Sequence, residues 1–280
     1  MIAPIRAASI RRIPIILPNS SKIRDGASRY FVRDDDAGEL TGELRLFVEM
    51  FANCGIPVSY QVIPARLTPA CAAFFLDMSS GYPGMIEFGQ HGLHHQMWLG
   101  DREVARAFGP EQTLEDQTQT ILDGLARMRA LLGEHARIDT FTAPRHKFDG
   151  NTVRTAAAAG FKVFSAACYE TPQHQLACAI GRALSASAIH HHGFSYNGRM
   201  RPEAPIIERS ISIAADDGKR RRYAARSLES ATRALGVRRT PVGMMFHHAL
   251  YRGSDGRDAV SPIVASLGTH DRERFMLLGA

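Results

Sequence analysis

Hydrophobic positions along the chain alternate between two patterns: short apolar runs typical of buried strands, and longer segments with apolar residues at helical spacing. The apolar runs predict strands over residues 30–34, 57–64, 85–91, 140–144, 161–166, 206–213, 242–248 and 274–279. The helical spacing predicts helices over residues 38–55, 66–78, 113–133 and 152–160. Strands and helices therefore follow one another through most of the chain.

The helix expected after residue 112 has the clearest boundaries. Thr113 and Asp116 form a pattern that resembles a capping box, in which each side chain bonds the backbone of the other residue. Gly133 lies where the helix should stop. The apolar face between these two ends consists of Leu114, Ile121, Leu125, Met128 and Leu132.

The repeated order of strand and then helix, with short connections, argues for a parallel sheet. Roughly seven or eight such units in 280 residues make a closed or nearly closed barrel the first expectation. A doubly wound open sheet is the alternative. The sequence shows no internal repeat and no clear linker. We therefore expect one α/β domain over residues 28–280, preceded by a lead-in segment over residues 1–27.

The composition is that of an ordinary globular protein and narrows the function only slightly. Apolar residues make up 45% of the chain and charged residues 22%, and the formal net charge is +6. The basic residues are scattered apart from the run at 218–223, which we interpret as a solvated loop. A nucleic-acid partner is therefore the least favoured class.

The chain shows no sign of a membrane or secretory segment. No apolar run approaches the length of about 18 residues that a transmembrane helix needs. The apolar piece at residues 15–17, between Pro14 and Pro18, is shorter than the core of a secretory signal. Free buried thiols are favoured over disulfides because no close spacing pairs the four cysteines, Cys54, Cys71, Cys168 and Cys178. Together these points favour the cytoplasm.

Polar side chains that can bind a metal or move a proton gather where four of the predicted strands end. In parallel α/β folds, active groups collect at the carboxyl ends of the strands, where the loops begin. Four strand ends of this kind are much less expected by chance than one. The residues are Asp34, Asp35 and Asp36, then His91, His94 and His95, then Arg145 and His146, and finally His247 and His248.

The segment HGLHH places His91 and His95 four residues apart. On a helical turn these two imidazoles would share one face, which is a suitable spacing for binding one cation. His91 and His94 would also share a face, and a purely structural histidine cluster is the alternative. A catalytic zinc usually has three protein ligands and an open water position, so an aspartate could supply the third ligand.

Adjacent aspartates at a strand end suit two separate tasks. One carboxylate can bind the cation while its neighbour takes a proton from the bound water as general base. An acidic loop, or a helix N-cap at Asp36, is the alternative for these residues taken alone. His247, at the end of a fully apolar strand, could protonate a leaving amine from the opposite side of the metal or serve as a core histidine.

Four of these segments, in order, resemble the motifs of the polysaccharide deacetylases of carbohydrate esterase family 4. In this resemblance FVRDDDAG supplies the adjacent aspartates, with Asp35 as catalytic base and Asp36 as metal ligand. EFGQHGLHH supplies the histidine pair, with His91 and His95 as the other ligands and His94 beside them. The matching segments extend over most of the chain.

The two later motifs carry the groups that complete such a site. FTAPRHKFD matches the third motif around Pro144, and GMMFHHAL matches the last motif, which implies His247 as the general acid. The family normally has an arginine two residues before this proline, to orient the base, and the present chain has Thr142 there. Arg145 is the expected replacement, reaching the base from another backbone position.

Two features do not fit the resemblance. The family's aspartate–tryptophan motif is not recognisable, because the only tryptophan is Trp98. The segment near its expected place carries a histidine run instead, in which His190 and His192 would share one face of a strand. Asp34 takes the place of an apolar or aromatic residue, and strand alternation would turn it the same way as Asp36.

The resemblance implies a distorted (β/α) barrel with seven mostly parallel strands and a divalent metal, Zn²⁺ being favoured over Co²⁺ or another ion. It implies hydrolysis of acetyl groups, N-acetyl rather than O-acetyl, on an acetylated carbohydrate or related substrate. A non-catalytic glycan-binding protein on the same scaffold is the alternative, prompted by the missing arginine. A regular amidohydrolase barrel is less favoured, since its first strand would carry a His-x-His pair. The oligomeric state is left open.

Overall fold

The structure, a computed structural model, describes most of the barrel but not every segment of the chain. Predictions for the lead-in segment, the basic run, Cys168, Cys178 and the histidine run at 190–192 fall outside the described residues. The described residues are 30–104, 106–109, 111–167, 206–212, 242–251, 261, 264–265 and 275–279.

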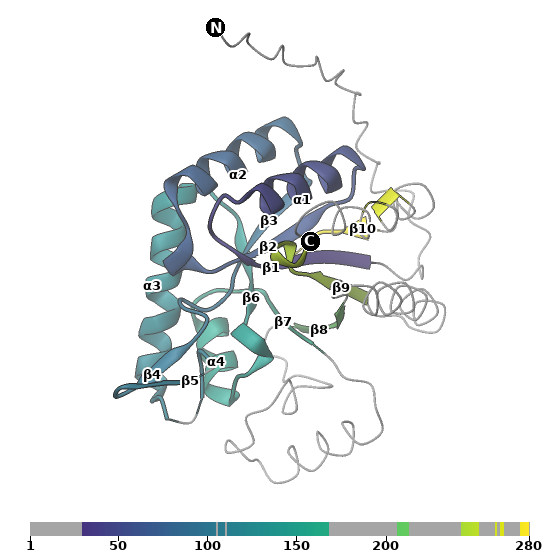
Figure 1. The fold of residues 1–280 in the computed structure, drawn as a ribbon. Helices are drawn as coiled ribbons and strands as arrows, with labels where there is room; N and C mark the ends of the chain where they lie inside the picture. Colours follow the sequence, from purple (N-terminus) through teal and green to yellow (C-terminus); the bar gives the residue numbers. More distant parts are fainter. Residues whose placement is uncertain are drawn as a thin grey trace, which may run out of the picture.

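One parallel sheet curls until its two ends meet (Figure 1). Its strands run in the order β1-β2-β3-β6-β7-β8-β9, and β1 pairs again with β9. This closure confirms the distorted barrel of seven parallel strands and excludes an open doubly wound sheet. The strands are β1 (Tyr30–Ala37), β2 (Val58–Val62), β3 (Ile86–Gln90), β6 (Ile138–Thr142), β7 (Val163–Ala167), β8 (Ile206–Ser212) and β9 (Val242–Phe246).

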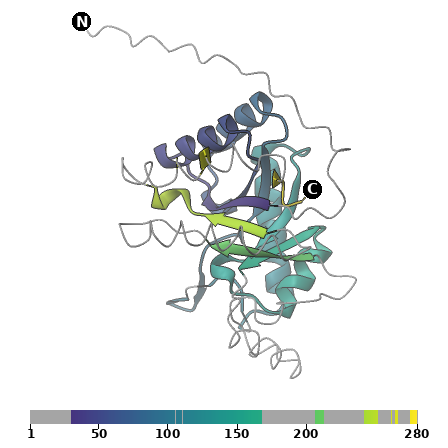
Figure 2. The same cartoon turned by 90° about the vertical axis from the view of Figure 1, so that its right-hand side faces the viewer.

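The helices of the described part of the chain pack against the outside of the curled sheet, as the views in Figures 1 and 2 show. The Thr113–Asp116 capping box is present at the start of α3, as predicted. No helix among the described residues is both long and apolar enough to cross a membrane. The helices are α1 (Gly42–Asn53), α2 (Pro69–Gly81), α3 (Leu114–Leu132) and α4 (Gly150–Ala158).

The main apolar core lies between these helices and the outer face of the barrel. Outward-facing positions of β1 and β2 alternate with inward-facing polar ones, which is the two-residue period of a strand. Cys71 is buried with this core as a free thiol, as the sequence predicts, and Cys54 is half-buried beside it. Large side chains that are fully buried in the core include Tyr30, Phe47, Phe51, Tyr60, Phe75 and Phe246.

The interior of the barrel is largely polar. Gln61 of β2 bonds Thr140 and Thr142 of β6, reaching across the intervening strand β3. Gly89 of β3 makes this contact possible, because a Cβ atom at that position would clash with Gln61 and Thr140. The interior therefore holds side chains that are hydrogen-bonded to one another across the strands.

The amino-terminal end of the barrel is closed by the segment 275–279. Strand β10 (Phe275–Met276) pairs with β1 at Tyr30 and Phe31, ahead of the point where β2 begins to pair. The Leu278 N–H then donates to Ser59 Oγ at 3.1 Å, and the Gly279 N–H donates to Glu87 at 3.0 Å. This segment therefore packs across the end of the barrel where the strands begin, away from their carboxyl ends.

Two local predictions about strands need correction. The sequence places the aspartates after a strand ending at Asp34, but β1 continues through them to Ala37. The pairing of β1 with β9 runs on to Asp34, and pairing with β2 resumes at Ala37, so the ladder keeps this segment extended. A short antiparallel hairpin, β4 (Met97–Leu99) and β5 (Arg102–Val104), was not predicted.

Candidate active site

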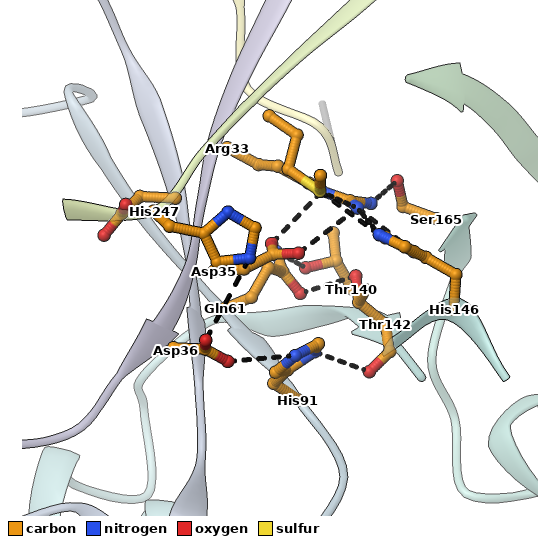
Figure 3. Close-up of polar contacts among 12 residues, drawn as sticks. Arg33, Asp35, Asp36, Gln61, His91, Thr140, Thr142, His146, Ser165 and His247 are labelled. Atoms are coloured by element: carbon orange, nitrogen blue, oxygen red, sulfur yellow. Dashed lines mark hydrogen bonds and ion pairs between the residues drawn. The ribbon is translucent and has the colours of Figure 1, made fainter. Parts of the chain in front are cut away.

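Three predicted ligands meet at the carboxyl ends of β1 and β3. Figure 3 shows two of them, Asp36 and His91. Asp36 Oδ1 lies 3.4 Å from His91 Nε2 and 3.2 Å from His95 Nε2. One ligand atom from each of the three side chains falls within 4.8 Å of the others. One carboxylate oxygen and two imidazole nitrogens form a typical donor set for zinc or a similar divalent ion.

The surroundings of this group fit a cation. Within the described part of the chain, the buried Asp36 Oδ1 has no hydrogen-bond donor, although two ring nitrogens face it. Burial opposes the charge of Asp36, but the two neighbouring imidazoles outweigh it and hold the pKa of Asp36 well below its usual range. A metal ion between these atoms would satisfy the orphaned oxygen and both rings, so the residues present suit a divalent metal.

A backbone contact fixes the orientation of the His91 ring. Its Nδ1 lies 3.0 Å from the main-chain oxygen of Thr142, so a proton on Nδ1 leaves Nε2 free to face Asp36. Burial opposes a positive charge on this ring, but the contact with Asp36 and the charge of Asp35 together raise the pKa of His91. The same carboxylates would favour a metal cation at this point.

A break in the regular strand geometry separates Asp36 from Asp34. The register with β2 shifts between Asp34 and Ala37, and Asp36 has a left-handed backbone with φ of 69°. The prediction that Asp34 and Asp36 share a face is therefore wrong, because strict alternation does not survive the irregularity. Asp36 turns to the histidines at the barrel mouth, whereas Asp34 binds His248.

Asp35, the predicted base, is buried beside a fully buried arginine. Arg33 Nε lies 3.2 Å from Asp35 Oδ1, and Arg33 Nη2 lies 3.3 Å from Asp35 Oδ2. The same guanidinium donates to Ser165 Oγ, lies 3.0 Å from Met245 Sδ and lies 3.4 Å from both ring nitrogens of His146. These contacts hold the arginine in one place and give Asp35 a paired charge and a fixed orientation.

The arginine beside the base therefore comes from β1 and not from the third motif. Arg145, the expected replacement, has an exposed side chain and is not among the described partners of Asp35. It lies with His146 in a left-handed turn that directs His146 into the barrel. A signal for Arg33 was present in the sequence, because residues two apart on a strand share a face.

The other predicted site residues occupy different positions around the mouth. His247 Nε2 lies 4.0 Å from Asp36 Oδ2, and Figure 3 shows the rings of His247 and His91 approaching different oxygens of Asp36. Pro144 is buried and packs so closely against Gly92 that a Cβ atom there would lie 2.8 Å from Pro144 Cγ. The side chain of His94 is exposed.

Comparison with known proteins gives matches by fold only. No protein-family model matches the sequence, and no curated protein sequence matches it. A candidate polysaccharide deacetylase from Mycobacterium smegmatis superimposes with a TM-score of 0.57 and 12% identity, over 95% of this chain and 90% of that one.

Two further solved structures show the range of proteins with this architecture. A family 4 acetyl xylan esterase from Clostridium thermocellum, solved with a cobalt ion, gives a TM-score of 0.52 at 11% identity, over 89% of this chain and 86% of that one. A mutant of a family 4 pseudoenzyme gives 0.51 at 9% identity, over 90% of this chain and 66% of that one. The chain therefore has the fold of the carbohydrate esterase family 4 deacetylases and esterases.

Proposed function

We propose that the protein is a metal-dependent hydrolase that removes acetyl groups, N-acetyl rather than O-acetyl, from a carbohydrate or related substrate. The observation that carries this proposal is one cluster at the barrel mouth. There a three-residue donor set lies beside an arginine-paired aspartate, and His247 Nε2 lies 4.0 Å from Asp36 Oδ2. The fold shared with acetyl xylan esterases and deacetylases supports the choice of an acetyl group.

Each side chain in the cluster has a distinct task. Asp36, His91 and His95 would hold the divalent ion, with Zn²⁺ favoured. When bound, such an ion supplies Lewis acidity and lowers the pKa of water from about 15.7 to about 7. Asp35, oriented by Arg33, takes the proton of the attacking water.

His247 gives a proton to the departing amine or alcohol. Its side chain is 29% exposed and faces the mouth of the barrel, so a substrate can reach it. A side chain that accepts or donates a proton in the reaction typically accelerates hydrolysis by about 10²–10⁴-fold. In this proposal Asp35 is the proton acceptor and His247 is the proton donor.

An exposed tryptophan that follows His95 closely in the chain supports a sugar substrate. Trp98 lies on β4, three residues after His95, and its side chain is 61% exposed. A flat indole on an open surface offers an apolar face on which a sugar ring can pack. The cytoplasmic location remains a prediction, and it would favour a precursor or small acetylated sugar over a finished wall polymer.

Metal loading and acetate release together test this function. The protein is stripped with a chelator and reloaded with Zn²⁺ or Co²⁺. Acetate release is then measured with N-acetylated chito-oligosaccharides and acetylated xylan. Asp36→Ala and His91→Ala should lose bound metal and lower activity by about 10³-fold or more. Asp123→Ala, an exposed aspartate on α3, is the matched control. If Asp36→Ala keeps its metal, the ligand assignment is wrong.

A non-catalytic glycan-binding protein is the second candidate. The fold is shared with a family 4 pseudoenzyme, and Thr142 stands where the family has its arginine. Arg33 argues against this candidate, because it supplies the missing guanidinium to Asp35. Retained binding of the same glycans, with no acetate released under either metal, would favour the binding protein over the hydrolase.

A further inference from the structure

Asp34 is a buried carboxylate that the proposed reaction does not use. Both of its oxygens contact one residue, His248, at the start of the 3-10 turn η5 (His248–Leu250). Oδ1 accepts the backbone N–H of His248 at 2.8 Å, and Oδ2 lies 2.7 Å from the ring Nδ1 of His248. The Asp34 side chain is 0% exposed and that of His248 is 5% exposed. This contact joins β1 to the segment that follows β9.

The backbone between β9 and η5 links the Asp34–His248 contact to the direction of the His247 side chain. Asp34 lies opposite Phe246 in the ladder between β1 and β9, so the two histidines follow directly beyond the carboxylate. His247 has an extended backbone, with φ of −136° and ψ of 101°. Neighbouring side chains on an extended backbone point to opposite sides. His248, held on the outer face by Asp34, therefore directs His247 toward the barrel mouth.

Aromatic packing holds the other end of the turn. The Tyr251 N–H donates to the His248 oxygen at 3.0 Å. The Tyr251 ring stacks on Phe47 of α1, with ring centres 5.9 Å apart and planes inclined by 10°. The turn is thus fixed to the barrel at one end and to the helix layer at the other, while the ring of His247 faces the site.

We propose that Asp34 and His248 form an anchor that positions His247 to protonate the leaving group. The inference rests on the proposed function, because that function makes His247 the general acid. Asp34 and His248 are positioning residues, since both are buried on the outer face and act through His247. The three consecutive aspartates then have three tasks: Asp34 positions the acid, Asp35 takes a proton and Asp36 holds the metal.

Two substrates with different leaving groups test the anchor in zinc-loaded protein. N-acetylated chitopentaose releases an amine that needs a proton, whereas 4-nitrophenyl acetate releases a phenolate that leaves without one. Asp34→Ala should lower kcat on chitopentaose by about 10²-fold or more, as His247→Ala does, with KM little changed. Hydrolysis of the aryl ester should stay within about threefold of wild type. Asp34→Asn keeps an oxygen acceptor for the His248 N–H, so it should retain more activity than Asp34→Ala.

Two controls separate positioning from general loss of structure. The double variant Asp34→Ala/His247→Ala should be no slower than His247→Ala alone, because both changes remove the same proton transfer. Val48→Ala, at a buried position of α1, should lower stability without changing the ratio of the two rates. Equal losses on both substrates, or additive losses in the double variant, would overturn the anchor.

A structural measurement decides the inference even if the proposed function fails. Hydrolysis of neither substrate by the wild type would reject the function but leave the anchor open to crystallography. In Asp34→Ala crystals the His247 ring should move away from Asp36, while Asp36, His91 and His95 keep their arrangement. His248→Ala, which retains the backbone N–H, provides the same comparison if Asp34→Ala does not fold. An unmoved His247 ring in either variant contradicts the anchor.

Discussion

The two ends of the barrel bury carboxyl groups beside different kinds of partner. At the carboxyl ends of the strands, Asp35 pairs with the Arg33 guanidinium and Asp36 faces two imidazoles. At the amino ends, Glu87 accepts hydrogen bonds from the Ser59 hydroxyl and the Gly279 N–H. One end therefore matches carboxylates with cations or potential cations, and the other matches a carboxyl with neutral donors.

The neighbouring groups shift the pKa values of the carboxyl groups in opposite directions at the two ends. Around Asp36 the imidazoles outweigh burial and lower the pKa of the carboxyl. Burial dominates around Glu87, where the Ser59 and Gly279 donors and the more distant charge of Arg137 compensate it only in part, so the pKa of Glu87 is raised. The lowered pKa of Asp36 suits a carboxylate that binds a metal, whereas the raised pKa of Glu87 belongs to a carboxyl at the closed end of the barrel.

The largest expected effect comes from removing the cation at the mouth. Arg33→Met leaves Asp35 buried without its paired charge, which should cost about 3–5 kcal/mol of unfolding free energy. Acetate release should fall by at least about 10²-fold, because the base loses its orientation. Urea unfolding and the chito-oligosaccharide assay measure the two effects. Arg33→Lys keeps the charge without the bidentate geometry, so it should recover only part of the lost stability and part of the lost activity. A stable, active Arg33→Met protein would remove Arg33 from the site.

A second expected effect is a pH dependence from the amino-terminal end. Because the folded state raises the pKa of Glu87, its contribution to stability is complete below the ordinary pKa of 4.5 and is lost as pH rises through the folded pKa. Wild-type stability should therefore fall relative to Glu87→Gln over that window, by at most about 1.4 kcal/mol per pH unit. Urea unfolding of both proteins at a series of pH values measures this slope. Parallel curves for the two proteins would contradict it.

The smallest expected effect concerns the hydrogen bonds that close the amino-terminal end. Ser59→Ala removes the acceptor for the Leu278 N–H and the hydroxyl donor to Glu87. The loss should be about 1–3 kcal/mol of unfolding free energy. Acetate release at a temperature where the variant remains folded should match wild type, because Ser59 lies at the end away from the site. A selective loss of activity in Ser59→Ala would show that the two ends are not independent.

The candidate metal ligands could be proposed from the sequence only with the help of the family resemblance. Local spacing left His94 open beside His95 and did not choose among the three aspartates, whereas the resemblance selected Asp36, His91 and His95, which the structure brings together. The partner of Asp35 was missed, since the resemblance directed attention to the third motif. The period of two along β1, which puts Arg33 and Asp35 on one face, was the local signal for it.

The sequence by itself determined the order of strands and helices, the amphipathic faces and the strand ends where candidate ligands gather, because these follow from short-range periodicity and residue chemistry. Only the tertiary structure decided which side chains meet. Closure of β1 on β9 brought His248 to Asp34, and the irregularity at Asp36 turned that residue away from Asp34. The first depends on pairing between segments about 200 residues apart, and the second on the register between β1 and β2. Local spacing encodes neither.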